Sequence, residues 1–184
     1  KDFARASGIL QLVALESLKP AQQIYASTLR AELDMSNNKP KAALRALAHP
    51  SMDRLGELPV EQQVRSQLVR ASALQATGQS LAAARERAFI APLLSGVNAA
   101  SNNEAIWHLV SNLPVAELQA SGDADFDGWL ALARTTKGAG TLEQQQAAID
   151  TWVEQNPEHP AAQQLPQALV ELKKLSSQPL TEIA

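Results

Sequence analysis

Six residues in the second half of the chain carry the pattern of a calcium-binding loop. In the run Asp123-Ala124-Asp125-Phe126-Asp127-Gly128, carboxylates alternate with other side chains and a glycine follows them. Calcium needs several hard oxygen ligands, a sharp glycine turn and a bidentate Glu at position 12 of the loop. Position 12 here is Arg134, a cation, and position 9 is Ala131. We therefore interpret the run as the acidic N-cap and first turn of a helix, which the helix dipole favours.

The three histidines do not form a metal-binding pattern. His49 and His159 each precede a proline, which predicts that they lie in loops at helix ends. His108 follows Trp107 in a predicted helix, with no His or carboxylate four residues later. The sequence contains neither an HExxH pattern nor a cysteine. We therefore predict no metal site and a structural or solvent-facing place for each histidine.

Nucleophilic and phosphate-binding patterns are also missing from the sequence. Ser7-Gly8 and Ser95-Gly96 lack the strand–turn–helix setting of a nucleophile elbow. The segment Gly138-Ala139-Gly140-Thr141 has no GK[ST] sequel, so it is interpreted as a flexible turn followed by an N-cap. Glu57 and Glu61 are typical of solvated helix starts rather than of a paired acid and base. We predict a protein that is not an enzyme, with no catalytic or cofactor-binding residues and no cofactor.

The sequence predicts two helices between positions 126 and 160, next to the acidic run. On the first, Phe126, Trp129, Leu130 and Ala133 share one face, and on the second Leu142, Gln145, Ile149, Trp152 and Val153 do so. Thr141 and Gln144 match a capping box, and Pro157 and Pro160 predict the end of the second helix. Trp107, Trp129 and Trp152 are each expected in the core, where an aromatic ring buries ~150–250 Å². A helix pair with two apolar faces needs neighbours, as in helical repeat arrays.

Composition favours an all-α protein. Hydrophobic residues make up 45% of the 184 residues but aromatic residues only 4%, and alanine and leucine dominate. The formal net charge of −3, with scattered Lys and Arg, argues against nucleic acid or anionic lipid as partners. Apolar periodicity and turn residues predict helices over residues 3–18, 20–35, 43–48, 59–76, 81–89, 101–110, 114–120, 126–134, 142–153 and 167–175, with loops at 50–58 and 92–100.

Two of these helix pairs are alike. Asn37 followed by Ala42 matches Gly78 followed by Ala83, at an offset of 41 residues. In both, a long helix ends at a turn residue and a small residue follows where two helices would cross closely. The pattern resembles the second half of a tetratricopeptide repeat, although that repeat is ~34 residues long.

An ordered series of segments resembles one protein family. The segments are QQIYASTLRAEL at 22–33, GQS at 78–80, APLLSG at 91–96, NNEAIWHLVSNLP at 102–114, GWLALAR at 128–134 and IDTWVEQNPEHPAAQQLP at 149–166. Together they resemble the amino-terminal domain of the LpoA family, outer-membrane lipoproteins that activate a class A penicillin-binding protein. The resemblance implies an elongated array of antiparallel helix pairs, a tetratricopeptide-like superhelix without an enzymatic site.

The same resemblance implies a domain organisation and a location. Residues 1–176 would form the helical repeat-like domain, and residues 177–184 would lead into a carboxyl-terminal α/β domain that this chain does not include. That second domain would make the main contact with the penicillin-binding protein, while peptidoglycan is a further possible partner. The full-length protein would be lipid-anchored on the periplasmic side of the outer membrane. The partner-binding residues of this chain stay unassigned.

Two other functions fit a helical array. A tetratricopeptide-like adaptor would hold extended peptides in a concave surface, although the predicted inner helices are rich in Ala and Gln rather than in charged residues. A helical superhelix attached to a lytic transglycosylase would require a lysozyme-like domain beyond residue 184. The resemblance favours the regulator of peptidoglycan synthesis over both.

Overall fold

The computed structural model describes residues 3–12 and 14–176, and every regular element within them is a helix. This confirms the all-α prediction. The chain forms two compact units, Lys1–Leu93 and Leu94–Ala184. The first contains α1 (Phe3–Leu12), η1 (Leu15–Ser17), α2 (Pro20–Ser36), α3 (Pro40–Ala46), η2 (Pro50–Glu57), α4 (Val60–Ala76), α5 (Ser80–Ile90) and η3 (Ala91–Leu93). The second contains α6 (Gly96–Ser111), η4 (Val115–Glu117), α7 (Ala124–Gly138), α8 (Leu142–Gln155), α9 (Pro160–Gln163) and α10 (Gln167–Ser176). The predicted lead-in at 177–184 lies outside the described residues.

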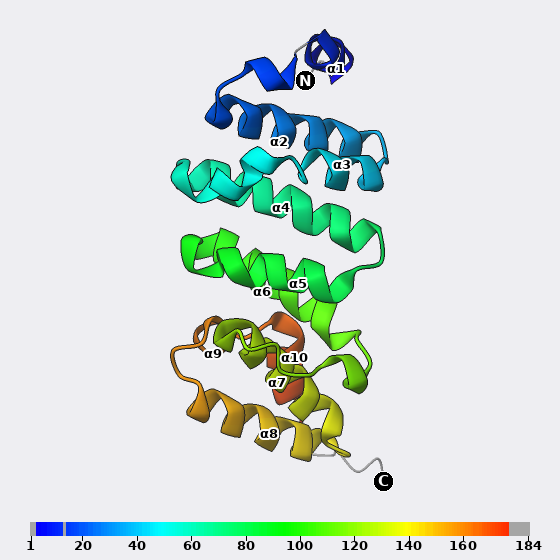
Figure 1. Ribbon diagram of the computed structural model, residues 1–184. Coiled ribbons are helices and arrows are strands. Elements are labelled where there is room, and N and C mark those ends of the chain that lie inside the picture. The colour runs from blue at the N-terminus through cyan, green and yellow to red at the C-terminus, as the bar shows by residue number, and fades with distance from the viewer. Residues whose placement is uncertain (1–2, 13, 177–184) are drawn as a thin grey trace. The chain divides into compact units, whose positions relative to one another are not determined.

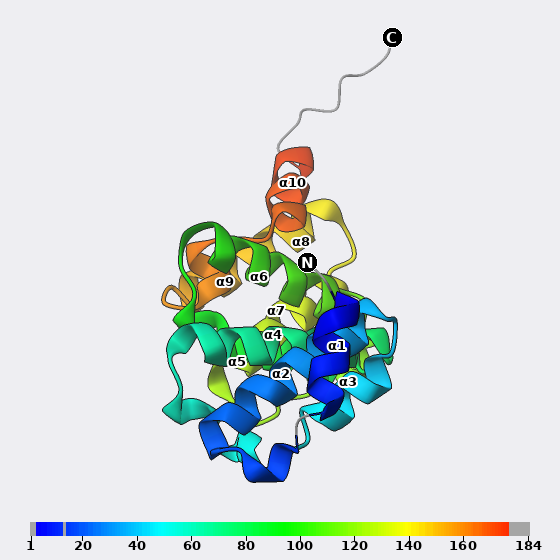
Figure 2. The same ribbon diagram turned by 90° about the horizontal axis from the view of Figure 1, so that it is seen from above.

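The first unit is built from two helix pairs joined by equivalent turns. Asn38 and Gly78 both have positive φ, 56° and 80°. The N–H of the next residue, Lys39 or Gln79, bonds to the carbonyl five residues earlier, which closes the helix end as in a Schellman motif. α3 packs against both α2 and α4, which also contact each other (Figures 1 and 2).

The turns correct the predicted offset between the two pairs. The left-handed residue of the first turn is Asn38 rather than Asn37, so the repeat is 40 residues long. α2 and α4 begin 40 residues apart, as do α3 and α5. Ala43 and Ala83, one repeat apart, are both fully buried. Small residues at these two positions let neighbouring helix backbones approach closely.

A polar cluster lies inside the apolar core of the first unit. The Thr28 hydroxyl of α2 lies 2.8 Å from the Ser66 hydroxyl of α4, and both are almost fully buried. The Gln62 amide donates to both hydroxyl oxygens at 3.1 Å, and Thr28 donates to the Ile24 carbonyl. Every hydroxyl and both amide protons therefore have a partner, and the bonds join α2 to α4. Periodicity of apolar residues did not predict this cluster.

The core of the second unit forms around α7 and α8. Phe126, Trp129, Leu130 and Ala133 are at most 1% exposed, which confirms the predicted face of α7. Ile149 is fully buried and Trp152 is 5% exposed on α8, whereas Leu142 at its start is 46% exposed. Trp107 of α6 is 7% exposed, so all three tryptophans belong to the core. α6 packs against α7, and α10 packs against α8.

Several predicted boundaries in the first unit were wrong. The predicted helix over 3–18 is two elements, since α1 ends at Leu12 and a 3-10 turn covers Leu15–Ser17. The predicted loop at 50–58 is largely the 3-10 helix η2. The apolar pattern of residues 81–89 predicts Phe89 on one side with Leu81, Ala84 and Ala88. Phe89 is instead 64% exposed, because α5 buries Ala83, Ala84, Ala88 and Ile90.

The predicted boundaries of the second unit also needed correction. The irregular segment predicted at 92–100 ends at Ser95, and α6 begins at Gly96. The spacing of Ser101 and Glu104 predicts a second capping box, but both residues lie inside α6 and do not form one. The Glu104 carboxylate instead accepts from the Gln167 N–H. The segment at 114–120 forms only a short 3-10 turn. Pro160 does not end helical structure, since it occupies the first turn of α9, where its missing N–H costs nothing.

Candidate functional site

The acidic run at 123–128 caps α7, as predicted. Asp123 is the N-cap residue, and its carboxylate accepts from the Phe126 N–H at 3.2 Å. The Asp127 carboxylate faces back toward the preceding turn, where it accepts from the Ser121 N–H at 2.6 Å and the Gly122 N–H at 3.0 Å. The side chain of Arg134 donates to the Leu118 carbonyl. Two of the carboxylates that a calcium loop would need, those of Asp123 and Asp127, are thus engaged in closing the helix start.

Of the three histidines, His159 and His49 bond to backbone groups at helix ends. The Nδ1 atom of His159 accepts from the Ala161 N–H at 3.1 Å, and its Nε2–H donates to the Asp125 carbonyl at 2.8 Å. His49 similarly accepts from the Ser51 N–H at the start of η2. Both lie at helix ends, as predicted, whereas His108 is solvent-exposed on α6.

The remaining candidates are also accounted for. Glu57 forms an ion pair with Arg54, and Glu61 is exposed in the first turn of α4. Ser95 precedes α6 without a side-chain capping bond, and Ser7 lies in α1. Thr141 and Gln144 form the predicted capping box. Among the described residues, no group of three or more His, Asp or Glu could hold a metal ion.

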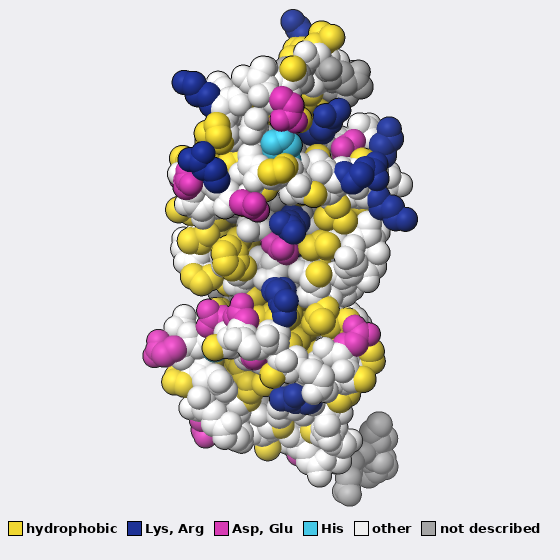
Figure 3. Space-filling view, viewed as in Figure 1, with side chains coloured by type: hydrophobic (Ala, Val, Ile, Leu, Met, Phe, Trp, Pro, Cys, Tyr) yellow, Lys and Arg dark blue, Asp and Glu magenta, His cyan; other side chains and the backbone are white. Residues whose placement is uncertain are grey.

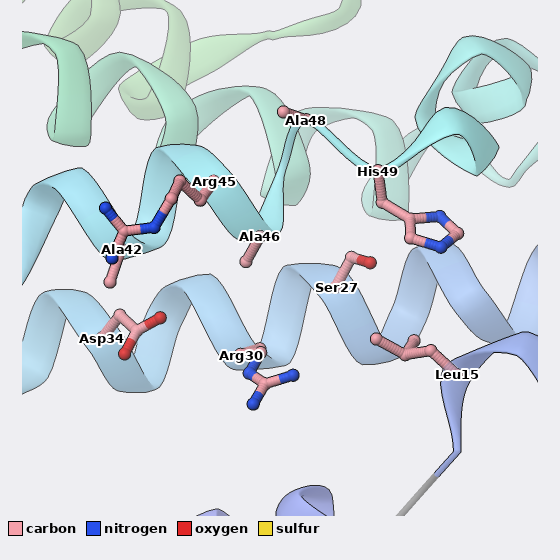
Figure 4. A pocket seen from close by; sticks show the side chains of 9 residues that line it. All are labelled: Leu15, Ser27, Arg30, Asp34, Ala42, Arg45, Ala46, Ala48 and His49. Carbon is pink, nitrogen blue, oxygen red and sulfur yellow. The ribbon is translucent and has the colours of Figure 1, made fainter.

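A groove between α2 and α3 is the most distinctive polar site of the first unit. Its pocket has a volume of about 440 Å³. α2 contributes Ser27, Arg30 and Asp34, and α3 contributes Arg45 together with the methyl groups of Ala42 and Ala46 (Figure 4). Leu15 of η1, Ala48 and His49 complete the lining. We call this pocket the α2–α3 groove.

The charged groups of the α2–α3 groove do not neutralise one another. Within the described residues, Arg30, Asp34 and Arg45 form no side-chain hydrogen bond or ion pair. Elsewhere in the same unit, Arg65 pairs with Glu32 and Arg54 pairs with Glu57. Two arginines without partners in one pocket are available to bind an anion from outside.

The α2–α3 groove also contains a buried hydroxyl without a partner. Ser27 is 1% exposed, and its Oγ atom has no hydrogen-bond partner in the part of the chain that the structure describes. Leaving a buried polar group unsatisfied costs about 1–3 kcal/mol, and native structures contain few such groups. A ligand atom reaching the floor of the pocket would satisfy this hydroxyl.

Positive charge continues beyond the groove. A neighbouring pocket of about 560 Å³ shares Ala42 and Arg45 with it and is also lined by Lys39 and Lys41. The two pockets together carry four basic side chains and one carboxylate, on a chain with a net charge of −3. Dark-blue side chains gather accordingly beside the start of α3 in Figure 3. By contrast, the pocket around Tyr25 contains the neutralised Arg54–Glu57 pair.

Sequence analysis did not identify this site. Arg30 and Arg45 are 15 positions apart and belong to different helices, so only the packing of α3 on α2 brings them to one pocket. The one available signal was the cluster of basic residues at 39, 41 and 45 without acidic residues between them.

Comparison with known proteins assigns the chain to a family. The family model described as "LppC putative lipoprotein" matches residues 1–184. The penicillin-binding protein activator LpoA of Vibrio cholerae serotype O1 is 27% identical over 176 residues, covering 93% of this chain and 29% of that protein. LpoA of Edwardsiella ictaluri is 30% identical over 178 residues, covering 91% of this chain and 25% of that protein. The chain thus spans less than a third of the length of these relatives.

Solved structures show the same fold. The LpoA amino-terminal domain of Haemophilus influenzae superposes with a TM-score of 0.74 at 21% identity, covering 92% of this chain and 79% of that chain. The amino-terminal domain of Escherichia coli LpoA gives a TM-score of 0.74 at 21% identity, with 92% and 76% covered. These similarities confirm the predicted fold, and the family match confirms the resemblance found in the sequence. The chain belongs to the LppC family, and it matches the helical amino-terminal domain of the LpoA proteins.

Proposed function

We propose that this chain is the non-catalytic helical arm of an outer-membrane lipoprotein that activates peptidoglycan synthesis by a class A penicillin-binding protein. The match of the LppC family model to residues 1–184 carries the proposal, together with relatives named as penicillin-binding protein activators. The arm would act as a spacer and platform that extends from the outer membrane toward the cell wall.

The roles of the polar residues support a non-catalytic arm. The side chains of Asp123, Asp127 and His159 form hydrogen bonds with backbone groups at helix ends. General acid–base catalysis needs groups that are free to exchange a proton with a substrate in a cleft. The polar residues highlighted in the sequence hold helix starts and turns in place instead.

We further propose that the main contact with the penicillin-binding protein is made by a part of the full-length protein outside this chain. The chain spans 29% of its Vibrio cholerae relative, so most of that relative has no counterpart here. A lipid anchor would hold the full-length protein on the periplasmic side of the outer membrane. The helical arm would then set the distance between the anchor and the part that contacts the synthase.

Three protein forms test this proposal: the full-length protein without its lipid, this chain alone, and the full-length protein lacking residues 1–176. Each is added to the class A penicillin-binding protein of the same organism, and glycan polymerisation and peptide cross-linking are measured. We expect stimulation by the first and third forms and none by the chain alone. In cells, the third form should fail to replace the full-length protein, because it lacks the spacer. Absence of stimulation by the full-length protein would overturn the proposal.

A further inference from the structure

We propose that the α2–α3 groove is a binding site for the carboxylate side chains of an extended acidic peptide. Arg30 and Arg45 line one pocket from two different helices and have no ion-pair partner within the described residues. A guanidinium group presents paired N–H donors that match the geometry of a carboxylate. The two arginines therefore offer two separate guanidinium groups to the carboxylates of a peptide that lies along the groove.

The floor of the groove adds a third polar contact. Ser27 is 1% exposed, lines the same pocket and has no partner for its hydroxyl among the described residues. A carboxylate oxygen of the peptide that reached this floor could accept the Ser27 O–H. This hydroxyl is an observation independent of the charges, and it indicates that the pocket is completed by a ligand atom.

Asp34 favours a peptide over a compact polyanion. Its carboxylate lines the same pocket as Arg30 and Arg45 and has no side-chain partner within the described residues. Its negative charge repels any anionic group, and a phosphate has no backbone N–H to offer it in return. It could, however, accept a backbone N–H of a peptide that runs along the groove. A chain with alternating carboxylates and amides satisfies Asp34 and both arginines together.

The neighbouring pocket extends the site, so that it can bind several successive residues of one peptide. Arg45 and Ala42 belong to both pockets, and Lys39 and Lys41 line the second one. Successive acidic residues of one peptide would therefore meet Arg30, then Arg45, then the two lysines. Alanine methyl groups from α3 supply the apolar contacts between these charges. This binding site goes beyond the activator function proposed above and does not depend on it.

A fluorescent peptide that alternates Glu and Ala, blocked at both ends, tests the site directly. Fluorescence anisotropy is measured on titration with the chain, and a second peptide carries Gln in place of Glu. We expect a Kd of ~10–100 μM for the Glu peptide. Binding of the Gln peptide should be about tenfold weaker or undetectable, because charge-assisted hydrogen bonds are lost. Equal binding of both peptides would overturn the proposal.

Single substitutions test whether the Glu peptide binds in the α2–α3 groove. Arg30→Gln and Arg45→Gln should each weaken binding of the Glu peptide about tenfold. Arg54→Gln is the matched control, because Arg54 is exposed in the same unit but already pairs with Glu57. It should leave binding unchanged. A similar loss for all three variants would indicate diffuse surface charge and would overturn the assignment to the groove.

Ser27→Ala separates binding from folding. The substitution removes a buried hydroxyl that has no partner in the free protein, so the melting temperature should stay the same or rise. Binding of the Glu peptide should nevertheless weaken. Inorganic phosphate and vesicles of anionic lipid serve as competitors. Displacement of the peptide by either at similar concentrations would overturn the specificity for a peptide.

Discussion

The imidazole ring of His159 lies edge-on to the indole ring of Trp152, with ring centroids 5.0 Å apart and planes inclined at 81°. A second indole, that of Trp129, lies 5.4 Å away on α7. The same imidazole bonds to the Asp125 carbonyl through Nε2 and to the Ala161 N–H through Nδ1. One side chain therefore joins the starts of α7 and α9 to the aromatic core of the second unit.

The stability of the second unit should decrease when the pH falls below about 6.5, the ordinary pKa of histidine. Burial lowers the pKa of His159 and outweighs the hydrogen bond to the Asp125 carbonyl and the charge of Asp125, which both raise it. Between the unfolded and folded pKa values, the unfolded chain binds a proton that the folded chain does not. The free energy of unfolding must therefore decrease as the pH falls through this window. Above it both states are neutral, and the effect disappears.

Tryptophan fluorescence during urea denaturation measures this effect, since all three tryptophans lie in the second unit. His159→Asn is the matched variant, because Asn also caps helices but does not titrate. The variant should be less stable at neutral pH, yet lose less stability on acidification than the unmodified chain. An equal loss in both would assign the pH dependence to other groups.

Replacing Gly128 by alanine should destabilise the second unit, although alanine is the better helix former. A Cβ atom at this position would lie 2.5 Å from Cδ2 and Nε2 of His159. The gain in helix propensity is about 1 kcal/mol. Displacing the imidazole would cost the bond to Asp125 and the contacts with both indoles, and overpacking typically costs about 1–3 kcal/mol. The net change in the free energy of unfolding should therefore be a loss.

Gly138→Ala is the control on the same helix, because nothing lies within 4 Å of its Cβ position. It should be neutral or stabilising by up to about 1 kcal/mol in urea denaturation. In a His159→Ala background, Gly128→Ala should also become neutral or stabilising. A stabilising effect of Gly128→Ala in the unmodified chain would show that the imidazole can move aside at no cost.

Local signals in the sequence correctly predicted the starts of α7 and α8. The Asp123 cap and the Thr141–Gln144 capping box are correct because each depends on neighbours within one turn. The exposure of Phe89 was not predictable in the same way. On an alanine-rich helix such as α5, several faces are apolar, and the packing partner decides which face is buried.

The polar cluster and the α2–α3 groove were not predicted, because their residues come from different helices that meet only in the folded chain. Thr28 and Ser66 are 38 residues apart, and their burial contradicts the expectation that apolar residues fill a helix interface. Arg30 and Arg45 likewise meet at one pocket only because α3 packs against α2. Periodicity describes one helix at a time, so it cannot show which polar side chains converge.

Calcium should not bind the acidic turn before α7. The Asp127 carboxylate already accepts from the N–H and hydroxyl of Ser121 and from the Gly122 N–H. We expect the same midpoint of thermal unfolding with calcium and with a chelator. Asp127→Ala should lower that midpoint equally in both, because hydrogen bonds to a charged group contribute about 1.5–3 kcal/mol. A rise in the midpoint with calcium that Asp127→Ala abolishes would contradict the capping interpretation.

The buried cluster between α2 and α4 should be sensitive to loss of a single hydroxyl. Thr28→Val preserves the shape of the side chain but leaves the Ser66 hydroxyl and the Gln62 amide without the oxygen that they share. We expect a loss of about 1–3 kcal/mol in the free energy of unfolding, measured by far-UV circular dichroism in urea. Ser72→Ala is the control, because that hydroxyl bonds only to the Leu68 carbonyl of its own helix.

Replacing the whole cluster should cost less than removing one member. In the triple variant Thr28→Val, Gln62→Leu and Ser66→Ala, no buried donor or acceptor of the three side chains is left unsatisfied. Exchange of both partners of a hydrogen bond for apolar groups can be nearly neutral, so the triple variant should recover much of the stability lost in Thr28→Val. If Thr28→Val costs no more than Ser72→Ala, the cluster contributes little to the packing of α2 on α4. If instead the triple variant is the least stable of all, the polar bonds themselves stabilise the interface.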